Sequence, residues 1–174
     1  MNITGSRPQW IESGGGPLLF APRRSLSNWH GNSAAHGSIS DYARACDIKD
    51  EIAALLIGDA QALVLGDEPD RTALIEIHPG TVLLVRWRWA DSEAALMAAL
   101  DSAELDTLSF SSLGTFEATP GPYHLFDSVY EGAAVPHALQ SSLKGGRYSY
   151  ESMEFRPHDK ICALLHRIGP VPLA

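Results

Sequence analysis

The sequence predicts a mainly β protein with a minor helical part, built as an antiparallel sheet or sandwich of about ten short strands with one helix at about residues 91–102. Two observations support this fold class. Short segments rich in β-branched and aromatic residues recur along the chain, separated by Gly or Pro. One of them, Thr81–Trp89, alternates with the two-residue period of a strand. The length of 174 residues is that of a single domain.

Two hairpins are expected among these strands. Residues 71–77 and 81–89 alternate most clearly, and His78-Pro79-Gly80 between them favours a tight turn. Lys144-Gly145-Gly146 predicts a second hairpin, which joins residues 138–143 to residues 147–153. The other strands are expected at residues 10–12, 18–21, 52–57, 62–65, 108–117, 123–126 and 161–168.

The helix at about residues 91–102 is predicted by its start and by its apolar side. Asp91 or Ser92 can cap the N-terminus, and Glu93 suits the positive first turn of a helix. Apolar side chains then recur at helical spacing, at Leu96, Met97 and Leu100. We expect this helix to cover one face of a sheet. A shorter helical segment is expected at residues 41–47.

Two stretches, residues 62–89 and 123–150, share a loose plan. Each runs through a short strand, an acidic turn, a second strand, a glycine-containing turn and a third strand. The plan fits a duplication of one three-stranded unit, and it fits equally an antiparallel meander without any common origin.

Composition indicates a cytoplasmic protein with no membrane partner. Residues 1–9 are expected to form a flexible tail without the apolar segment of a signal peptide, and residues 10–174 one domain. The purely apolar runs, such as Ile52–Ile57, are much shorter than the ~20 residues of a membrane-spanning helix. The two cysteines, Cys46 and Cys162, are expected to be reduced thiols.

The formal net charge of −8 disfavours direct binding to nucleic acid, because such binders need clustered Lys and Arg. Two interpretations of the charge remain. It serves solubility alone, or it provides an acidic face for a basic partner.

The sequence contains no complete catalytic or metal-binding constellation, so no catalytic residue, metal ion or cofactor is predicted. His30 and His36 are not spaced as ligands on one helix face. The glycine-rich segment Gly14–Pro17 lacks the Lys and the Ser or Thr of a phosphate-binding loop, and no GxSxG motif occurs. A protein that acts by presenting a surface to a partner fits this composition best.

Two alternatives from other classes stay open. One is an enzyme in which Cys46 acts with a distant histidine. The other is a small-ligand-binding β module that uses Trp29 and the turn at Gly14–Pro17.

A series of short motifs spread over most of the chain resembles the immunity protein 21 family of bacterial polymorphic toxin systems. The number and order of these motifs, rather than any single one, carry the resemblance. They are Trp10-Ile11-Glu12-Ser13 with Gly15-Gly16-Pro17-Leu18; Trp29 and Gly31; Asp41-Tyr42 with Arg44-Ala45-Cys46; Leu63-Val64-Leu65-Gly66-Asp67-Glu68-Pro69; Arg86-Trp87 with Ala90-Asp91; Leu125-Phe126-Asp127-Ser128 with Gly132; Gly146 and Tyr148; and Leu165-His166-Arg167.

The resemblance implies a mostly β, immunity-type domain without catalytic activity. Such a protein binds a cognate toxin domain in the cytoplasm of the producing cell and neutralises it. A basic nuclease is one candidate for the toxin, because acidic turns would accelerate its approach. On that basis we expect partner contacts at five acidic residues: Asp67, Glu68, Asp70, Asp127 and Glu131. The motif residues themselves are expected to define the fold.

Overall fold

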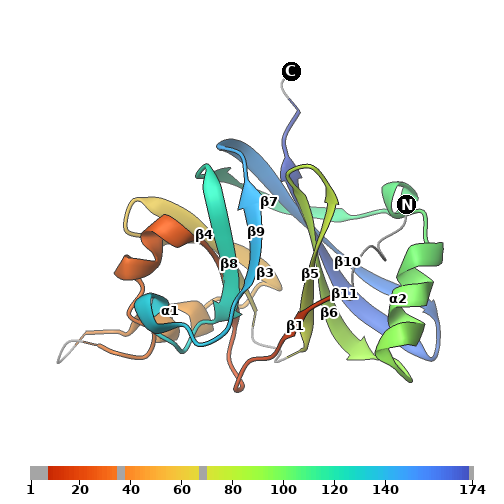
Figure 1. The fold of residues 1–174 in the computed structure, drawn as a ribbon, viewed down its shortest axis with the longest axis horizontal. Helices are drawn as coiled ribbons and strands as arrows, with labels where there is room; N and C mark the ends of the chain where they lie inside the picture. Colours follow the sequence, from red (N-terminus) through yellow and green to blue (C-terminus); the bar gives the residue numbers. More distant parts are fainter. Residues whose placement is uncertain (1–7, 35–37, 67–69, 173–174) are drawn as a thin grey trace.

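The structure, a computed structural model, describes residues 8–34, 38–66 and 70–172. Within these ranges eleven strands form two antiparallel sheets, one of six strands and one of five. The sheets face each other as the two layers of a sandwich (Figure 1). The predicted fold class, mainly β with antiparallel strands and a minor helical part, is confirmed.

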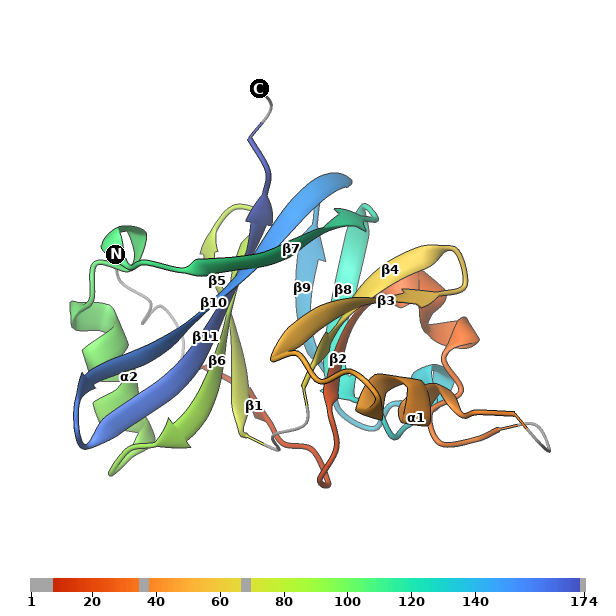
Figure 2. The ribbon, with the colours of Figure 1, turned by 180° about the vertical axis from the view of Figure 1, so that it is seen from behind.

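The six-stranded sheet, which we call sheet A, has the order β1-β5-β6-β11-β10-β7. Every neighbouring pair in it is antiparallel. The two-residue β1 and the longer β7 form its edges (Figure 2). Its strands, in that order, are Trp10–Ile11, Thr72–His78, Thr81–Trp89, Ile161–Pro170, Gly146–His158 and Ser111–Ala118.

The five-stranded sheet, sheet B, has the order β3-β4-β2-β8-β9 and is also antiparallel throughout. Its central strand β2 is buried at all five positions. The reason is that sheet A covers one face of sheet B, while short helices and loops cover the other (Figure 1). Its strands, in that order, are Ile52–Ile57, Ala60–Leu65, Leu18–Pro22, Gly121–Asp127 and Leu139–Leu143.

Aromatic and aliphatic side chains from both sheets fill the space between them. Phe20 of sheet B packs on Tyr123 with ring centroids 4.9 Å apart, and Phe116 of sheet A lies 6.0 Å from Tyr148. All four rings are buried. Burial of each such side chain contributes about 1.5–3 kcal/mol, so this layer supplies much of the folding free energy.

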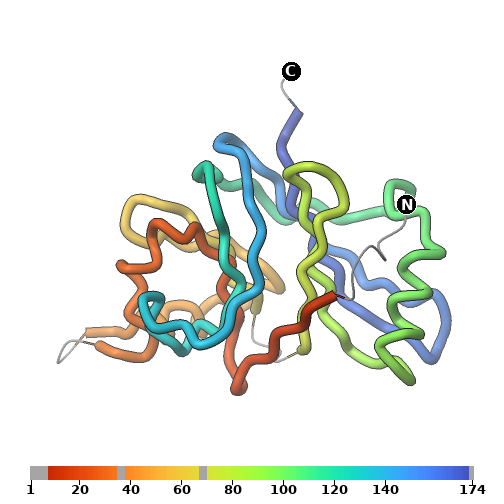
Figure 3. Tube along the Cα trace, in the orientation of Figure 1, coloured from red at the N-terminus to blue at the C-terminus, as the bar shows by residue number. Residues whose placement is uncertain are grey.

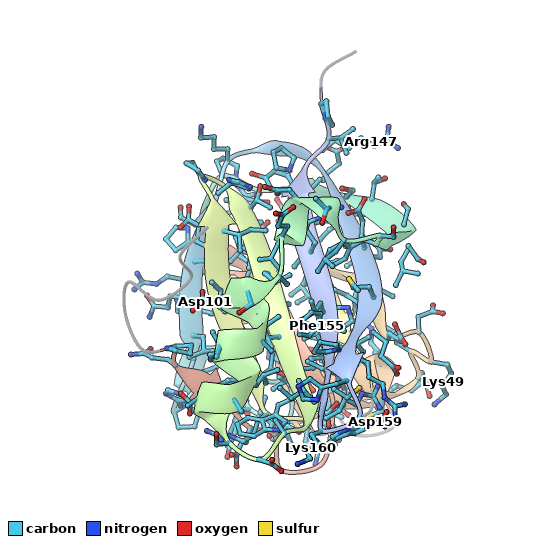
Figure 4. All side chains as sticks on the ribbon, turned by 90° about the vertical axis from the view of Figure 1, so that its right-hand side faces the viewer. Lys49, Asp101, Arg147, Phe155, Asp159 and Lys160 are labelled. Carbon is cyan, nitrogen blue, oxygen red and sulfur yellow. The ribbon has the colours of Figure 1, made fainter. Side chains whose placement is uncertain are left out.

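The helix α2, Glu93–Ser102, covers the outer face of sheet A, as the sequence predicts. Ser92 caps it by accepting a hydrogen bond from the amide of Ala95. In Figure 4 the helix lies in front of the strands of sheet A. Its three buried side chains belong to a second core that includes Phe155, namely Leu96, Met97 and Leu100.

The first predicted hairpin is confirmed and the second is wrong. β5 and β6 pair from Thr72↔Arg86 to His78↔Thr81. By contrast, β9 pairs with β8 in sheet B, whereas β10 pairs with β7 and β11 in sheet A. The turn at Lys144-Gly145-Gly146 therefore carries the chain from one sheet to the other. A glycine turn permits either course, and the buried Tyr148 and Tyr150 draw β10 into the inter-sheet core.

The two stretches that share a loose plan differ in topology. In the first, β4 lies in sheet B and both β5 and β6 lie in sheet A. In the second, β8 and β9 both lie in sheet B and the crossing follows the second strand. The chain trace in Figure 3 shows these crossings. The topologies fit independent meanders better than a repeated unit.

Short helices complete the fold around sheet B and α2. The predicted segment at residues 41–47 forms α1, Asp41–Cys46, and Ser40 caps its N-terminus.

No helix in the described part of the chain is long and apolar enough to cross a membrane. Residues 1–7 of the expected tail lie outside the described residues. Three 3-10 helices that the sequence did not predict are η1 Arg23–Asn28, η2 Leu105–Thr107 and η3 Gly132–Ala134.

Candidate functional site

The side chains that could support chemistry do not assemble into a reactive centre among the described residues. Cys46 is a free, partly buried cysteine, and the nearby Lys49 ammonium donates to its carbonyl oxygen at 2.9 Å rather than contacting its sulfur. Cys162 is fully buried, and this burial raises the pKa of its thiol. No group of three or more His, Cys, Asp or Glu side chains in the described ranges could hold a metal ion.

A serine and a histidine do meet, but inside the protein. Ser152 of β10 and His166 of β11 are register partners, and Ser152 Oγ lies 2.5 Å from His166 Nδ1. Burial, together with the neighbouring cations of Arg86 and Arg88, lowers the pKa of His166 to about 3. Because the ring is 0% exposed and Ser152 is buried, the pair cannot reach a substrate and has a structural role.

Three of the five predicted contact residues fall in the sequence between β4 and β5. Asp67 and Glu68 lie outside the described residues. Asp70 is described, and its Oδ2 lies 3.4 Å from Nε of Arg88 on β6. This ion pair links Asp70 to the second strand of the β5–β6 hairpin. Its neighbour Arg86 is 2% exposed and donates from Nη2 to the carbonyl oxygen of Gly66 at 3.0 Å.

The other two predicted contact residues, Asp127 and Glu131, lie at opposite ends of one turn and differ in exposure. Asp127 is 5% exposed, and its carboxylate accepts hydrogen bonds from the amides of Gly14 at 2.8 Å and Val129 at 3.1 Å. Glu131 is exposed and accepts a 2.6 Å hydrogen bond from Ser33 Oγ. The carboxylate of Glu131 is thus available at the surface, whereas that of Asp127 holds the turn.

Trp29 connects this turn to the loop that precedes α1. Its indole, 1% exposed, donates from Nε1 to the carbonyl oxygen of Ser128 at 3.0 Å, and its own carbonyl accepts from the amide of Gly132 at 2.9 Å. The amide of Asn32 donates to the carbonyl of Val129 at 3.0 Å. Trp29 therefore packs within the protein, where its ring is not available to a small ligand.

Two glycines permit the close approach of these loops. Gly31 has φ of +55°, and a Cβ there would lie 2.4 Å from the carbonyl oxygen of Val129. A Cβ on Gly132 would lie 2.2 Å from the carbonyl oxygen of Leu26. Any larger residue would force the backbones apart, so both positions define the fold.

We call the surface formed by His30–Ser33 and Val129–Glu131 the loop surface. It is held by the backbone and side-chain hydrogen bonds described above, and it exposes a large aromatic side chain, Tyr130, which is 45% exposed. The adjoining α1 is tied to the same loop, because Asp41 accepts from the amide of His30 at 2.8 Å. A fixed loop pair with an exposed tyrosine and a carboxylate has the composition of a protein-binding surface.

Tyr130 was not among the residues predicted from sequence. It lies in the short segment Val129-Tyr130-Glu131, which has no periodic pattern of its own. The flanking residues could have indicated its exposure. Asp127-Ser128 and Gly132 are typical of a turn, and a tyrosine within a turn is expected at the surface.

Comparison with known proteins gives one family. A family model described as Immunity protein 21 matches residues 9–161, which is most of the chain. No curated protein matches the chain, and no solved structure does. The matched range includes sheet B, α1, α2, the loop surface and the strands of sheet A other than β11, of which it reaches only the first residue.

Proposed function

Because this chain belongs to the immunity protein 21 family, we propose that it binds a cognate toxin domain in the cytoplasm of the producing bacterium and neutralises it. Residues 10–174 would act as one immunity-type domain, by protein–protein binding and without catalysis. The match of the family over residues 9–161 is the observation that carries this proposal.

The loop surface is the part of the molecule that we propose to contact the toxin. Tyrosine is enriched among the residues that contribute most to binding energy, so Tyr130 would be the central anchor. Glu131 would lie at the rim beside it. Since hydrogen bonds already hold both loops, little conformational entropy would be lost on binding, and this favours affinity.

The five predicted acidic contacts take different parts in this proposal. Glu131 would touch the toxin directly, and Asp127 would act through the turn that it holds. Asp70 is already paired with Arg88, so it would contribute to the long-range electrostatic attraction of the toxin rather than to a direct contact. Contacts at Asp67 and Glu68 remain a prediction from the sequence.

The net charge of −8 supports a basic toxin, such as a basic nuclease, as the partner. Complementary charge accelerates the encounter of two proteins by long-range attraction. This would matter for immunity, because the producing cell must capture the toxin before it acts.

The experiment that tests this function is co-expression with the toxin candidate encoded beside the gene. We expect the candidate to stop growth when expressed alone, and the chain to restore growth and co-purify with it. A double variant, Tyr130→Ala with Glu131→Arg, should lose both effects. Glu104→Arg is the matched control, since Glu104 is exposed and closely follows α2, which lies at the opposite end of the molecule from α1 (Figure 1). Growth arrest that the wild-type chain does not relieve would contradict the proposal.

A further inference from the structure

A cavity with a volume of about 600 Å³ opens on the outer side of sheet B, next to the loop surface. Its floor is formed by β8 and β9, where His124 and Gln140 are register partners. One wall is η1, which contributes Arg23 and Leu26, and the other wall begins at η3. Gly132 belongs both to this wall and to the turn that Trp29 holds.

The charged and titratable side chains that line this cavity are all basic. Arg23, His124 and His137 lie around it, and none of its lining residues is an Asp or a Glu. The guanidinium of Arg23 is close enough to His124 that, in addition to burial, it lowers the pKa of the imidazole. Among the described residues no carboxylate pairs with Arg23. Arg23 is exposed, so its charge is available to a ligand of this cavity in a chain whose net charge is −8.

The other lining residues are apolar or small. Leu26 is buried, Val135 and Ala138 are partly buried, and Pro136 and Ala133 are exposed at the rim. A ligand that fills the cavity must therefore combine a negative group with an aliphatic part. A glutamate or aspartate side chain of a protein has this composition, whereas a free inorganic anion would leave the apolar wall uncovered.

From this arrangement we propose that the cavity is a carboxylate-binding pocket that receives an acidic side chain of the partner protein. Arg23 would form the charge-assisted hydrogen bonds to the carboxylate, while Gln140 and the two imidazoles donate to its remaining lone pairs. The proposal rests on the toxin-binding function, because it names the toxin as the source of the carboxylate. It adds to the loop surface a second, chemically distinct contact on the same side of sheet B.

The first test is the affinity for the toxin, measured by calorimetry. Arg23→Gln should weaken binding at least about tenfold, since it removes the cation that would pair with the partner's carboxylate once the interface covers both groups. Arg24→Gln is the matched control, because Arg24 is exposed on the same 3-10 helix, lies outside the cavity lining and changes the net charge equally. It should change the affinity less than about threefold. Equal effects of the two variants, or none, would overturn the proposal.

A second test does not depend on the toxin, so the failure of the pocket and the failure of the proposed function can be told apart. N-acetyl-L-glutamate amide is titrated into the protein, with the side chains of His124 and His137 followed by NMR. Both should move in the wild type and in Arg24→Gln but not in Arg23→Gln. N-acetyl-L-glutamine amide, at matched ionic strength, should move neither.

Each outcome of this titration decides whether the cavity binds a carboxylate. If the toxin does not bind but blocked glutamate does, the proposed function fails and the carboxylate pocket stands. If blocked glutamate leaves both histidines unmoved, the pocket is overturned even where the toxin binds. If inorganic phosphate moves them more strongly than blocked glutamate, the site takes a small anion and the assignment to a partner side chain is overturned.

Discussion

Ser152 and His166 face each other across β10 and β11, and the serine hydroxyl lies 2.5 Å from the imidazole Nδ1 in the buried layer between the two sheets. Arg86 lies in the same layer, 2% exposed, and disfavours a second positive charge on the histidine. The imidazole is therefore held neutral. A serine beside a histidine is chemically suggestive in a sequence, and here it forms part of a polar group inside the sandwich.

This pair predicts that stability falls in acid. The pKa of His166 is about 3 in the folded protein and 6.5 when it is unperturbed. Between these values the unfolded state binds a proton that the folded state does not, so stability is full above pH 6.5 and decreases as the pH falls toward 3. Within this range the unfolding free energy should change by about 1.4 kcal/mol per pH unit because of this one group.

Urea unfolding at several pH values measures this slope. His166→Gln should have a shallower dependence of unfolding free energy on pH than the wild type, because it removes the titrating group. His137→Gln, which makes the same change at an exposed histidine, is the control and should give the profile of the wild type. Parallel pH profiles for the wild type and His166→Gln would show that His166 does not control acid stability.

The contact between Gly31 and the turn predicts a cost for any side chain at that position. Gly31→Ala would place a Cβ 2.4 Å from the carbonyl oxygen of Val129 at a φ of +55°. We expect a loss of about 1–3 kcal/mol in unfolding free energy. Gly14→Ala is the control, since its Cβ would have an ordinary 3.7 Å contact with Asp127. Equal stability of the two variants in urea unfolding would contradict the close approach.

Asp127 and Glu131 predict different phenotypes for two acids of the same turn. Asp127→Asn should lower both stability, by about 1–3 kcal/mol, and affinity for the toxin, because an amide cannot accept both backbone hydrogen bonds of the carboxylate. Glu131→Gln should leave stability unchanged and weaken binding alone. Unfolding and calorimetric binding curves for both variants measure this. A stable Asp127→Asn protein would contradict the structural role of Asp127.

The net charge predicts a salt-dependent association rate with a basic toxin. The association rate constant should fall steeply as ionic strength rises, while the dissociation rate constant changes much less. Stopped-flow mixing at several salt concentrations separates the two constants. An association rate that is independent of salt would remove the case for attraction between an acidic chain and a basic partner.

The sequence predicts most elements of this fold because local patterns determine them. Alternation and a Pro-Gly turn were sufficient for β5 and β6, and a capping serine with apolar spacing was sufficient for α2. The pairing of β9 was predicted wrongly, since the turn at Gly145-Gly146 leads equally well into a hairpin or into the opposite sheet. Long-range burial of Tyr148 and Tyr150 decides between these courses, and no local pattern records it.

The candidate site was predictable to a smaller extent for the same reason. Asp127 and Glu131 are both acids of one turn in the sequence, and only the fold makes one of them a buried acceptor and leaves the other exposed. Arg23, His124 and His137 come from three separate segments, which are brought together by the pairing of β8 with β9 and by η1. Their meeting depends on tertiary structure, so spacing along the chain could not reveal it.

The central claim, neutralisation by binding and without turnover, is tested most directly by titrating the active toxin with the purified chain at concentrations far above the dissociation constant. We predict that toxin activity falls linearly and vanishes when the two proteins are equimolar, as for a tight stoichiometric inhibitor. Complete inactivation by a small fraction of an equivalent would indicate catalysis by this chain. Full toxin activity in the presence of excess chain would contradict the account altogether.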